Sequence, residues 1–408
     1  MKAKLRGLIS LSETTTEILN SNHESVISTS AAIPFLIAEQ SAHQPILLVA
    51  HSSKRASDLV AEISEFIDGV MEFPAWETLP HERLSPNSDT VAKRIHTLLH
   101  LEDAKVVVST ARALVQPIIS SITTTPLLNL EIGKEFNFEA LLRELTLRAY
   151  SRVDLVERRG DFAVRGGIID VFLPLSAHPI RIDFFGDEIE DISYFEVADQ
   201  RTFQSISSTI EIYPCREFLI TPTVRAHAQE LKDSLPGASE LLEKISEGIS
   251  FEGMESLIPL LVEETETLIA RMPSNTQIIF IDYERIRSRA GDLLATNEEF
   301  LNASWSNAAH GAVAPIHDGS GTYMSWDIFD LEVTRCGFSR LNLSPFGSDL
   351  AEDTEFLDYR AIDPMRGDIE RTIEALRSAV DAHFTVVFAT HGHGMLERYA
   401  GIFRNADL

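Results

Sequence analysis

The sequence predicts an α/β protein in which a parallel-sheet domain is interrupted by an α+β domain with antiparallel strands. In the first 126 residues, continuous apolar runs such as PILLVA (45–50) and KVVVS (105–109) alternate with helical patterns. Such runs are typical of strands buried on both faces of a doubly wound parallel sheet. Between residues 127 and 205, β-rich runs instead follow one another directly across tight polar turns, which indicates antiparallel hairpins.

The elements of the first part, residues 1–126, follow from hydrophobic periodicity. Short β-rich runs predict strands, and apolar residues at helical spacing predict helices between them. Strands are predicted at 25–28, 45–50, 70–73 and 105–109, and helices at 31–40, 53–66 and 89–100. This strand and helix alternation is the basis for the α/β assignment.

The interrupting domain, residues 127–205, begins with one helix and continues with strands. The predicted helix spans 138–147, with Leu141, Leu142, Leu145 and Leu147 as its apolar residues. Strands are predicted at 154–164, 167–173, 180–185 and 189–197. The turn Gly186-Asp187-Glu188 suits a hairpin between the last two.

The α/β pattern returns in residues 206–343. The run QIIFID (277–282) is again a buried parallel-type strand, so we expect it to join the first sheet, with residues 127–205 as an insertion. Residues 344–358, rich in Gly, Ser, Asp and Glu, are predicted to form a linker. A helix (369–380), a strand (385–389) and a helix (395–403) then predict part of a further small α/β domain within 344–408. Because only about half of an α/β unit follows, we expect the chain to be part of a longer protein.

Composition limits the classes of function. Acidic residues outnumber basic ones 62 to 35, and the formal net charge of -27 disfavours nonspecific binding of nucleic acid by the chain as a whole. Local basic patches therefore carry more information. The separated Cys215 and Cys336 predict neither a disulfide framework nor a cysteine zinc site. With no apolar run long enough for a membrane span and no good secretory signal, we expect a cytoplasmic protein without a membrane partner.

Catalytic motifs are missing from the sequence. A phosphate-binding loop needs glycines, a lysine and a Ser/Thr hydroxyl, yet the turn within SVISTSAAIPFLIAEQ (25–40) has neither glycine nor lysine. No G-x-S-x-G, H-E-x-x-H or G-x-G-x-x-G motif is present. The pair His391 and His393 lacks accompanying ligands and is better interpreted as part of a glycine-rich loop. We therefore expect no catalytic residue, metal or cofactor for this chain.

One strand combines a cation with a large aromatic side chain. Because side chains alternate along a strand, Ile180, Ile182 and Phe184 of HPIRIDFF point to one face and Arg181, Asp183 and Phe185 to the other. If Arg165 shares the second face, Arg165, Arg181 and Phe185 form a candidate docking surface for a protein, since Arg and aromatic residues are enriched at interaction hot spots. The alternative is that Phe185 packs beneath a loop and the arginines pair with Asp170 or Asp183.

Two runs carry a resemblance to a known family. RRGDFAVRGGIIDVF (158–172) and PIRIDFFGDEIEDISYFEVADQRT (179–202) resemble the UvrB-homology module of bacterial transcription-repair coupling factors. The segment WETLPHERLSP (76–86) fits that family better than UvrB, which has an intact phosphate-binding loop and a tyrosine-rich DNA hairpin. The resemblance implies a degenerate RecA/Rossmann-like domain without ATPase activity of its own. It also implies that this chain by itself is not an enzyme.

The resemblance also implies partners. The inserted domain would bind UvrA, and Arg165, Arg181 and Phe185 match the family's contact positions. The full-length protein would displace RNA polymerase stalled at a lesion, using ATP and Mg in a translocase that acts on double-stranded DNA. The polymerase-interacting domain and the translocase would lie in domains beyond this chain. The UvrA-binding face would be masked by the C-terminal domain. An alternative hypothesis is a UvrB-like helicase fragment that binds ATP and damaged DNA.

Overall fold

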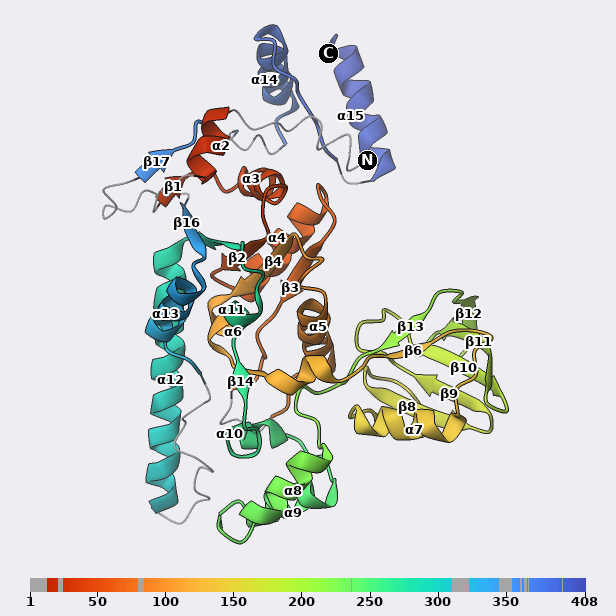
Figure 1. Cartoon of the computed structure of the whole chain (residues 1–408). Helices are drawn as coiled ribbons and strands as arrows, with labels where there is room; N and C mark the ends of the chain where they lie inside the picture. Colours follow the sequence, from red (N-terminus) through yellow and green to blue (C-terminus); the bar gives the residue numbers. More distant parts are fainter. Residues whose placement is uncertain are drawn as a thin grey trace. The chain divides into compact units, whose positions relative to one another are not determined.

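The computed structural model describes residues 13–20, 25–79, 84–235, 237–309, 323–344, 354–359, 362, 365, 367–390 and 392–408. The chain divides into two compact units, residues 1–358 and 359–408 (Figure 1). The first unit contains a large parallel sheet and an inserted sheet that is antiparallel except for one parallel pair at its edge. The α/β class with an interrupting α+β domain, predicted from the sequence, is therefore confirmed.

The parallel sheet has the strand order β17-β1-β16-β15-β2-β4-β3. Its strands are β1 (Ser25–Ile27), β2 (Ile46–Ala50), β3 (Val70–Phe73), β4 (Val106–Thr110), β15 (Gln277–Ile281), β16 (Ser339–Ser344) and β17 (Thr354–Phe356). Every neighbouring pair is parallel. β15 lies directly beside β2, so the sequence prediction that residues 277–282 complete the first sheet is correct.

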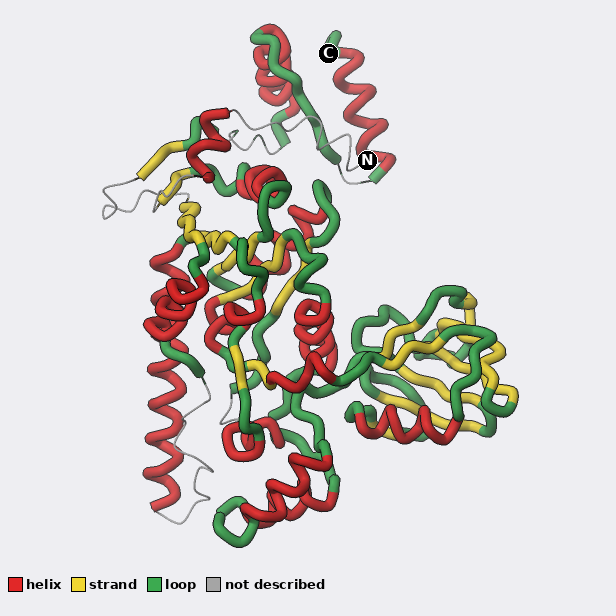
Figure 2. The backbone as a smooth tube through the Cα atoms, in the orientation of Figure 1, coloured by secondary structure: helices red, strands yellow, loops and turns green. Residues whose placement is uncertain are grey.

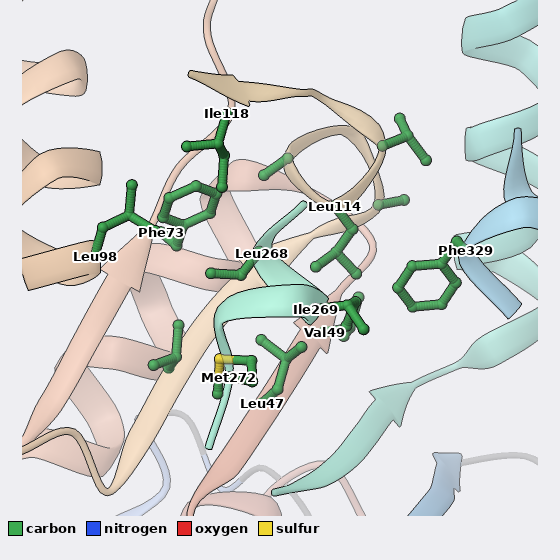
Figure 3. Packing of buried hydrophobic residues seen from close by; sticks show 14 of the residues in the cluster. Leu47, Val49, Phe73, Leu98, Leu114, Ile118, Leu268, Ile269, Met272 and Phe329 are labelled. Carbon is green, nitrogen blue, oxygen red and sulfur yellow. The ribbon is translucent and has the colours of Figure 1, made fainter. Parts of the chain in front are cut away.

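The central strands form the core because they are apolar throughout. All residues of β2, β4 and β15 are buried, as expected for a sheet covered on both faces. Figure 3 shows Leu268, Ile269 and Met272 packed near Leu47 and Val49 of β2. The β17 strand falls within the stretch predicted as a linker, where it pairs with β1.

Helices connect and cover these strands. In chain order the first unit has α2 (Glu13–Asn20), α3 (Ile33–Gln40), α4 (Ser53–Ser64), α5 (Ser88–Leu99), α6 (Ala111–Val115), α8 (Pro222–Leu231), α9 (Ser239–Glu247), α10 (Ile258–Leu261), α11 (Leu268–Arg271), α12 (Tyr283–Ala309) and α13 (Trp326–Cys336). The 3₁₀ helices are η2 (Ser120–Thr124) and η3 (Met254–Leu257), and the short strands β5 (Ile118–Ile119) and β14 (Thr265–Glu266) pair with each other.

Two paired strands, β6 (Leu128–Leu130) and β13 (Ile210–Ile212), stand at the two ends of the insertion, and β13 follows the predicted end at residue 205. Between them lie α7 (Phe138–Leu147) and a six-stranded sheet of order β12-β11-β10-β9-β8-β7. Its strands are β7 (Ser151–Arg152), β8 (Asp161–Arg165), β9 (Ile168–Val171), β10 (Ile180–Phe185), β11 (Glu188–Phe195) and β12 (Thr202–Ser205). In Figure 1, α7 lies along one side of this sheet, and its Leu141 and Leu145 are fully buried.

One buried ion pair fixes the chain where it leaves the insertion. Glu217, which follows β13, accepts hydrogen bonds from the Arg94 guanidinium of α5 and from the Trp76 indole N–H, the latter at 2.8 Å. The side chains of Arg94 and Glu217 are both 0% exposed. Trp76 belongs to the segment 76–86 that resembles transcription-repair coupling factors, of which residues 80–83 lie outside the described residues.

The second unit contains α14 (Ile369–Asp381) and α15 (His393–Asn405), as predicted. The strand predicted at 385–389 is wrong: this stretch is loop, visible between the two helices in Figure 2. A strand is stable only when its backbone N–H and C=O groups pair with a neighbouring strand. The described residues of this unit provide no such neighbour, and Val387 remains 57% exposed.

Candidate protein-docking surface on the inserted domain

The inserted sheet has two unlike faces. Side chains of directly paired residues point to the same face, so the strand register assigns each residue. The row Val164, Ile169, Ile182 and Ile192 packs with α7 in one apolar cluster. The opposite face, called the outer face below, carries Arg165, Ile168, Arg181, Asp183 and Phe185.

Register brings all three predicted residues to this outer face. Arg165 pairs with Ile168, and Ile168 pairs with Asp183 on the next strand. Arg181 and Phe185 lie two residues to either side of Asp183 on β10, and alternation gives them the same orientation. The strand alternation therefore places Arg165, Arg181 and Phe185 on one face, as the sequence predicts for β10.

Arg181 is held rigidly by a buried carboxylate. Its Nε and Nη2 atoms donate to the two carboxylate oxygens of Asp170 at 2.7 and 2.9 Å, and its Nη1 donates to the Gln200 carbonyl at 3.3 Å. The guanidinium also lies 5.1 Å from the centre of the Phe195 ring. Hydrogen bonding to Asp170 raises the pKa of Arg181. The pairing with Asp170 that the sequence left as an alternative is therefore present.

Phe185 is the most exposed large apolar side chain on this sheet. It is 73% exposed, so the alternative that it packs beneath a loop is wrong. Alternation along β10 orients the two phenylalanines, and the β-bulge beside them, where the register shifts between Asp183 and Phe184, leaves Glu190 of β11 without a partner. Phe184 turns inward, where its ring meets Phe138 of α7 edge-to-face at 5.2 Å. Phe185 consequently points outward.

Two tight turns shape the outer face. Gly166 and Gly167 connect β8 to β9, and Gly166 has a φ of +64°, which favours glycine. A Cβ on Gly167 would lie 2.9 Å from the carbonyl oxygen of Phe184, so only glycine lets this turn approach β10. At the other turn, Asp187 accepts hydrogen bonds from the Phe138 N–H at 3.1 Å and from the Asn137 amide. These bonds lower the pKa of Asp187 and tie the hairpin to the start of α7.

Carboxylates lie between the cations of the outer face. The site predicted from the sequence did not include these carboxylates. Asp183 is directly opposite Asp191 on β11. Burial raises the pKa of Asp183, although the charge of Arg181 opposes this. Asp191 is bound by the hydroxyls of Ser193 and Ser205. Alternation on β10 shows Asp183, but the contribution of Asp191 depends on the strand pairing.

Loops cover the remainder of the outer face. Val156, Ala163, Phe172 and Phe195 form a small buried cluster there. Arg159 donates to the Ser176 carbonyl at 3.1 and 3.2 Å and lies 5.3 Å from the Phe172 ring centre, while Arg158 is exposed. These two arginines sit at the turn before β8, apart from Arg165. The exposed part of the outer face is therefore the end of the sheet near Arg165, Asp183 and Phe185.

The surface is suited to binding rather than to catalysis. It combines an exposed aromatic ring, a fixed cation and carboxylates on a rigid sheet, a composition found at protein interfaces. Within the described ranges, no group of three or more His, Cys, Asp or Glu side chains is arranged to hold a metal ion. Nor does the described part of the chain contain a helix that is long and apolar enough to span a bilayer.

Comparisons with known proteins agree with this geometry. A family model described as "UvrB interaction domain" matches residues 128–218, which include the whole inserted sheet. A transcription-repair-coupling factor from Mycobacterium tuberculosis is 39% identical over 394 residues, covering 90% of this chain and 31% of the relative. That of Escherichia coli K12 is 30% identical, covering 71% and 25%, and that of Bacillus subtilis 26% identical, covering 64% and 24%.

The chain thus spans between about a quarter and a third of the length of these curated relatives. The match to the first of them extends over nearly the whole chain, on both sides of the insertion. Sheet order, interrupted architecture and sequence similarity all agree with the resemblance noted from residues 158–172 and 179–202. The chain therefore belongs to the transcription-repair-coupling factor family, and the outer face is part of its UvrB interaction domain.

Proposed function

We propose that this chain recruits UvrA to sites of transcription-coupled repair through the outer face of its inserted domain. The match to a UvrB interaction domain and the similarity to transcription-repair-coupling factors support action in this pathway. The proposal for UvrA itself rests on the resemblance, whose contact positions correspond to Arg165, Arg181 and Phe185. RNA polymerase, double-stranded DNA, ATP and Mg belong to the proposed activity of a whole family member in the cytoplasm.

The observation that supports the proposal most strongly is the exposure of Phe185. The ring of Phe185 is 73% exposed, so its apolar surface can be removed from water only when a partner covers it, and this burial favours binding. It stands beside Asp183 and near Arg165, so a partner would meet one apolar anchor surrounded by charges of both signs. Such an arrangement resembles a hot spot with a polar rim.

Replacing Phe185 tests the proposal directly. Phe185→Ala is expected to weaken UvrA binding by about 30-fold or more, because a central aromatic anchor typically contributes about 2 kcal/mol or more. Binding of purified UvrA to the immobilised chain measures the effect. The side chain makes few internal contacts, so the unfolding midpoint should change little.

Phe203→Ala provides the matched control. Phe203 is also exposed, at 49%, but it stacks near Tyr194 and His178 at the β12 edge of the sheet. The control should bind UvrA like the wild type. Equal affinity of Phe185→Ala and wild type would refute the assignment of the outer face.

Arg181 needs a different treatment from Phe185. Arg181→Ala combined with Phe185→Ala is expected to abolish UvrA capture, but the Arg181 change also acts on the fold. Removing Arg181 would leave the carboxylate of Asp170, which is 2% exposed, without its cation. A loss of binding by an Arg181 variant therefore needs a folding control, whereas Arg165, which is exposed and donates one bond to the Asp154 carbonyl, can be replaced directly.

A further inference from the structure

The parallel sheet has a topological switch point between β2 and β15. These neighbouring strands are parallel, with Phe280 opposite Val49. From β2 the chain passes through α4 to β3, beyond β4 on one side, whereas from β15 it passes to β16 on the other side. In open α/β sheets, ligands bind in the crevice at the carboxyl ends of strands where the connections diverge in this way.

The residues that follow these two strands are strongly basic. After β2 come His51, Ser52, Ser53, Lys54 and Arg55, and Ser52 caps α4 by accepting from the Arg55 N–H at 3.3 Å. After β15 comes Asp282, and then α12 begins with YERIRSR, which contains Arg285 and Arg289 one helical turn apart. Phe280 is opposite Val49 and the charge of Asp282 acts on His51, so both basic segments emerge at the same edge of the sheet.

The basic side chains at this edge are close enough to influence one another. Burial lowers the pKa of His51, and the charges of Arg285, Arg289 and Arg55 lower it further. The Nδ1 atom of His51 is buried and has no hydrogen-bond partner. These facts place the guanidinium groups from both segments around one imidazole. We call Lys54, Arg55, Arg285 and Arg289, with His51, the switch-point cluster.

Internal acids compensate this charge only in part. Arg55 forms an ion pair with Glu62 at 2.9 Å, and Asp282 is the acid that opposes the arginines at His51. Lys54, Arg285 and Arg289 are exposed, and the described residues offer them no ion pair or side-chain hydrogen bond. Lys54 and Arg285 lie in the first turns of α4 and α12, where a cation is unfavourable because a helix N-terminus carries partial positive charge, and Glu284 offsets this only at α12. A bound anion would relieve that repulsion.

The backbone at this edge is also unusual. Asp282 has a φ of +68°, a left-handed conformation that non-glycine residues rarely adopt. Its N–H donates to the Leu343 carbonyl at 3.1 Å, and the next N–H donates to the Asn342 side chain, which fixes the turn into α12. Strained backbone that is held in place by its surroundings is frequent at binding sites.

We propose that the switch-point cluster binds a chain of phosphates, either that of a free polyphosphate or nucleotide or that of a nucleic-acid backbone. Arginine guanidinium groups form charge-assisted bonds with phosphate oxygens, and the dipoles of the two helix N-termini favour a bound anion. The overall charge of -27 makes such a local cluster stand out. The site differs from the degenerate turn after β1, since β16 and β15 separate β1 from β2.

Replacing the two arginines of α12 tests this site. Wild type and Arg285→Gln/Arg289→Gln are titrated with inorganic tripolyphosphate by calorimetry and with a labelled single-stranded oligonucleotide by fluorescence anisotropy. We expect wild type to bind at least one probe saturably and the variant to bind it at least tenfold more weakly. For the oligonucleotide, the slope of log affinity against log salt should fall by about 2, one for each lost phosphate contact.

The control removes equal charge elsewhere. Arg201→Gln/Arg335→Gln replaces two highly exposed arginines that lie outside the cluster, with side chains 86% and 73% exposed, and should bind like wild type. Tripolyphosphate binding without oligonucleotide binding would identify a nucleotide-type ligand, and oligonucleotide binding would identify a nucleic-acid backbone. The proposal is overturned if neither probe binds saturably, or if the cluster variant and the control variant bind alike.

Discussion

Arg181 has both a structural and a surface role. It lies on the outer face, yet its guanidinium forms a two-point ion pair with Asp170, whose side chain is 2% exposed. Burying a carboxylate is costly unless it is paired and hydrogen-bonded. The ion pair with Arg181 offsets this cost for Asp170, which is buried in the middle of the sheet. The strength of the pair depends on keeping both partners.

The pair can be tested by a double-mutant comparison. Arg181→Met should lower the free energy of unfolding by about 3 kcal/mol, because it leaves the Asp170 carboxylate buried without its cation. Arg181→Met/Asp170→Asn should recover much of this loss, since the uncompensated charge is removed. Urea unfolding of both variants measures the difference. Equal destabilisation by the single and double changes would contradict a dominant role for the unpaired carboxylate.

Sequence alternation predicted part of this site and missed the rest for a clear physical reason. The period of two along β10 identified Arg181 and Phe185 on one face and the buried Ile180 and Ile182 on the other. The partner choice of Arg181 could not be decided between Asp170 and Asp183. That choice depends on the register between β9 and β10, which places Asp170 directly opposite Arg181.

Individual elements were predicted best where local pattern and tertiary pairing agree. The bounds of β3, α7 and β10 match their predicted ranges, and each of these segments has a strong apolar pattern. Asp154 to Gly160 was predicted as strand but is loop, and β8 begins at Asp161. In 385–389, β-branched residues favoured a strand that lacks a pairing partner among the described residues.

The start of α7 depends on a charged residue from a distant turn. Asp187 accepts bonds from Phe138 N–H and the Asn137 amide, which lower its pKa below the ordinary 3.8. The folded state therefore binds this proton less tightly than the unfolded state. The contribution of the Asp187 carboxylate to the stability of the folded state is complete above the ordinary pKa. It is lost as the pH falls through the lowered pKa.

This linkage predicts a pH-dependent effect of Asp187→Asn. The wild type should exceed the variant in free energy of unfolding at neutral pH, and the difference should shrink when the pH falls below about 4. Chemical denaturation between pH 3 and pH 7 measures it. A difference that stays constant over this range would show that the carboxylate charge does not stabilise the turn.

At the scale of the whole molecule, the two compact units differ in how much they bury. In α14 and α15 no described residue is buried, whereas Leu141 and Leu145 of α7 are 0% exposed. Apolar residues of the second unit such as Phe384 remain exposed, at 70%. Burial of apolar surface is the main source of stability, so the second unit should open more readily.

Hydrogen exchange tests this contrast within one sample. Backbone amides of α14 and α15 should exchange much faster than those of α7, because local opening there costs less free energy. Mass spectrometry of peptides from 369–381, 393–405 and 138–147 gives the comparison. Equal protection in the three helices would contradict the difference in local stability.

The pairing of β6 with β13 affects how the chain can fold. It brings Leu128 beside Ile212, so the insertion closes on itself and its two ends lie together. Once the insertion has folded, the open chain between β4 and β15 is roughly halved, which lowers the loop-closure cost by only about 0.6 kcal/mol. The larger effect concerns the order of folding. During synthesis the insertion is complete before β15 emerges, so the docking domain can fold before the parallel sheet is assembled.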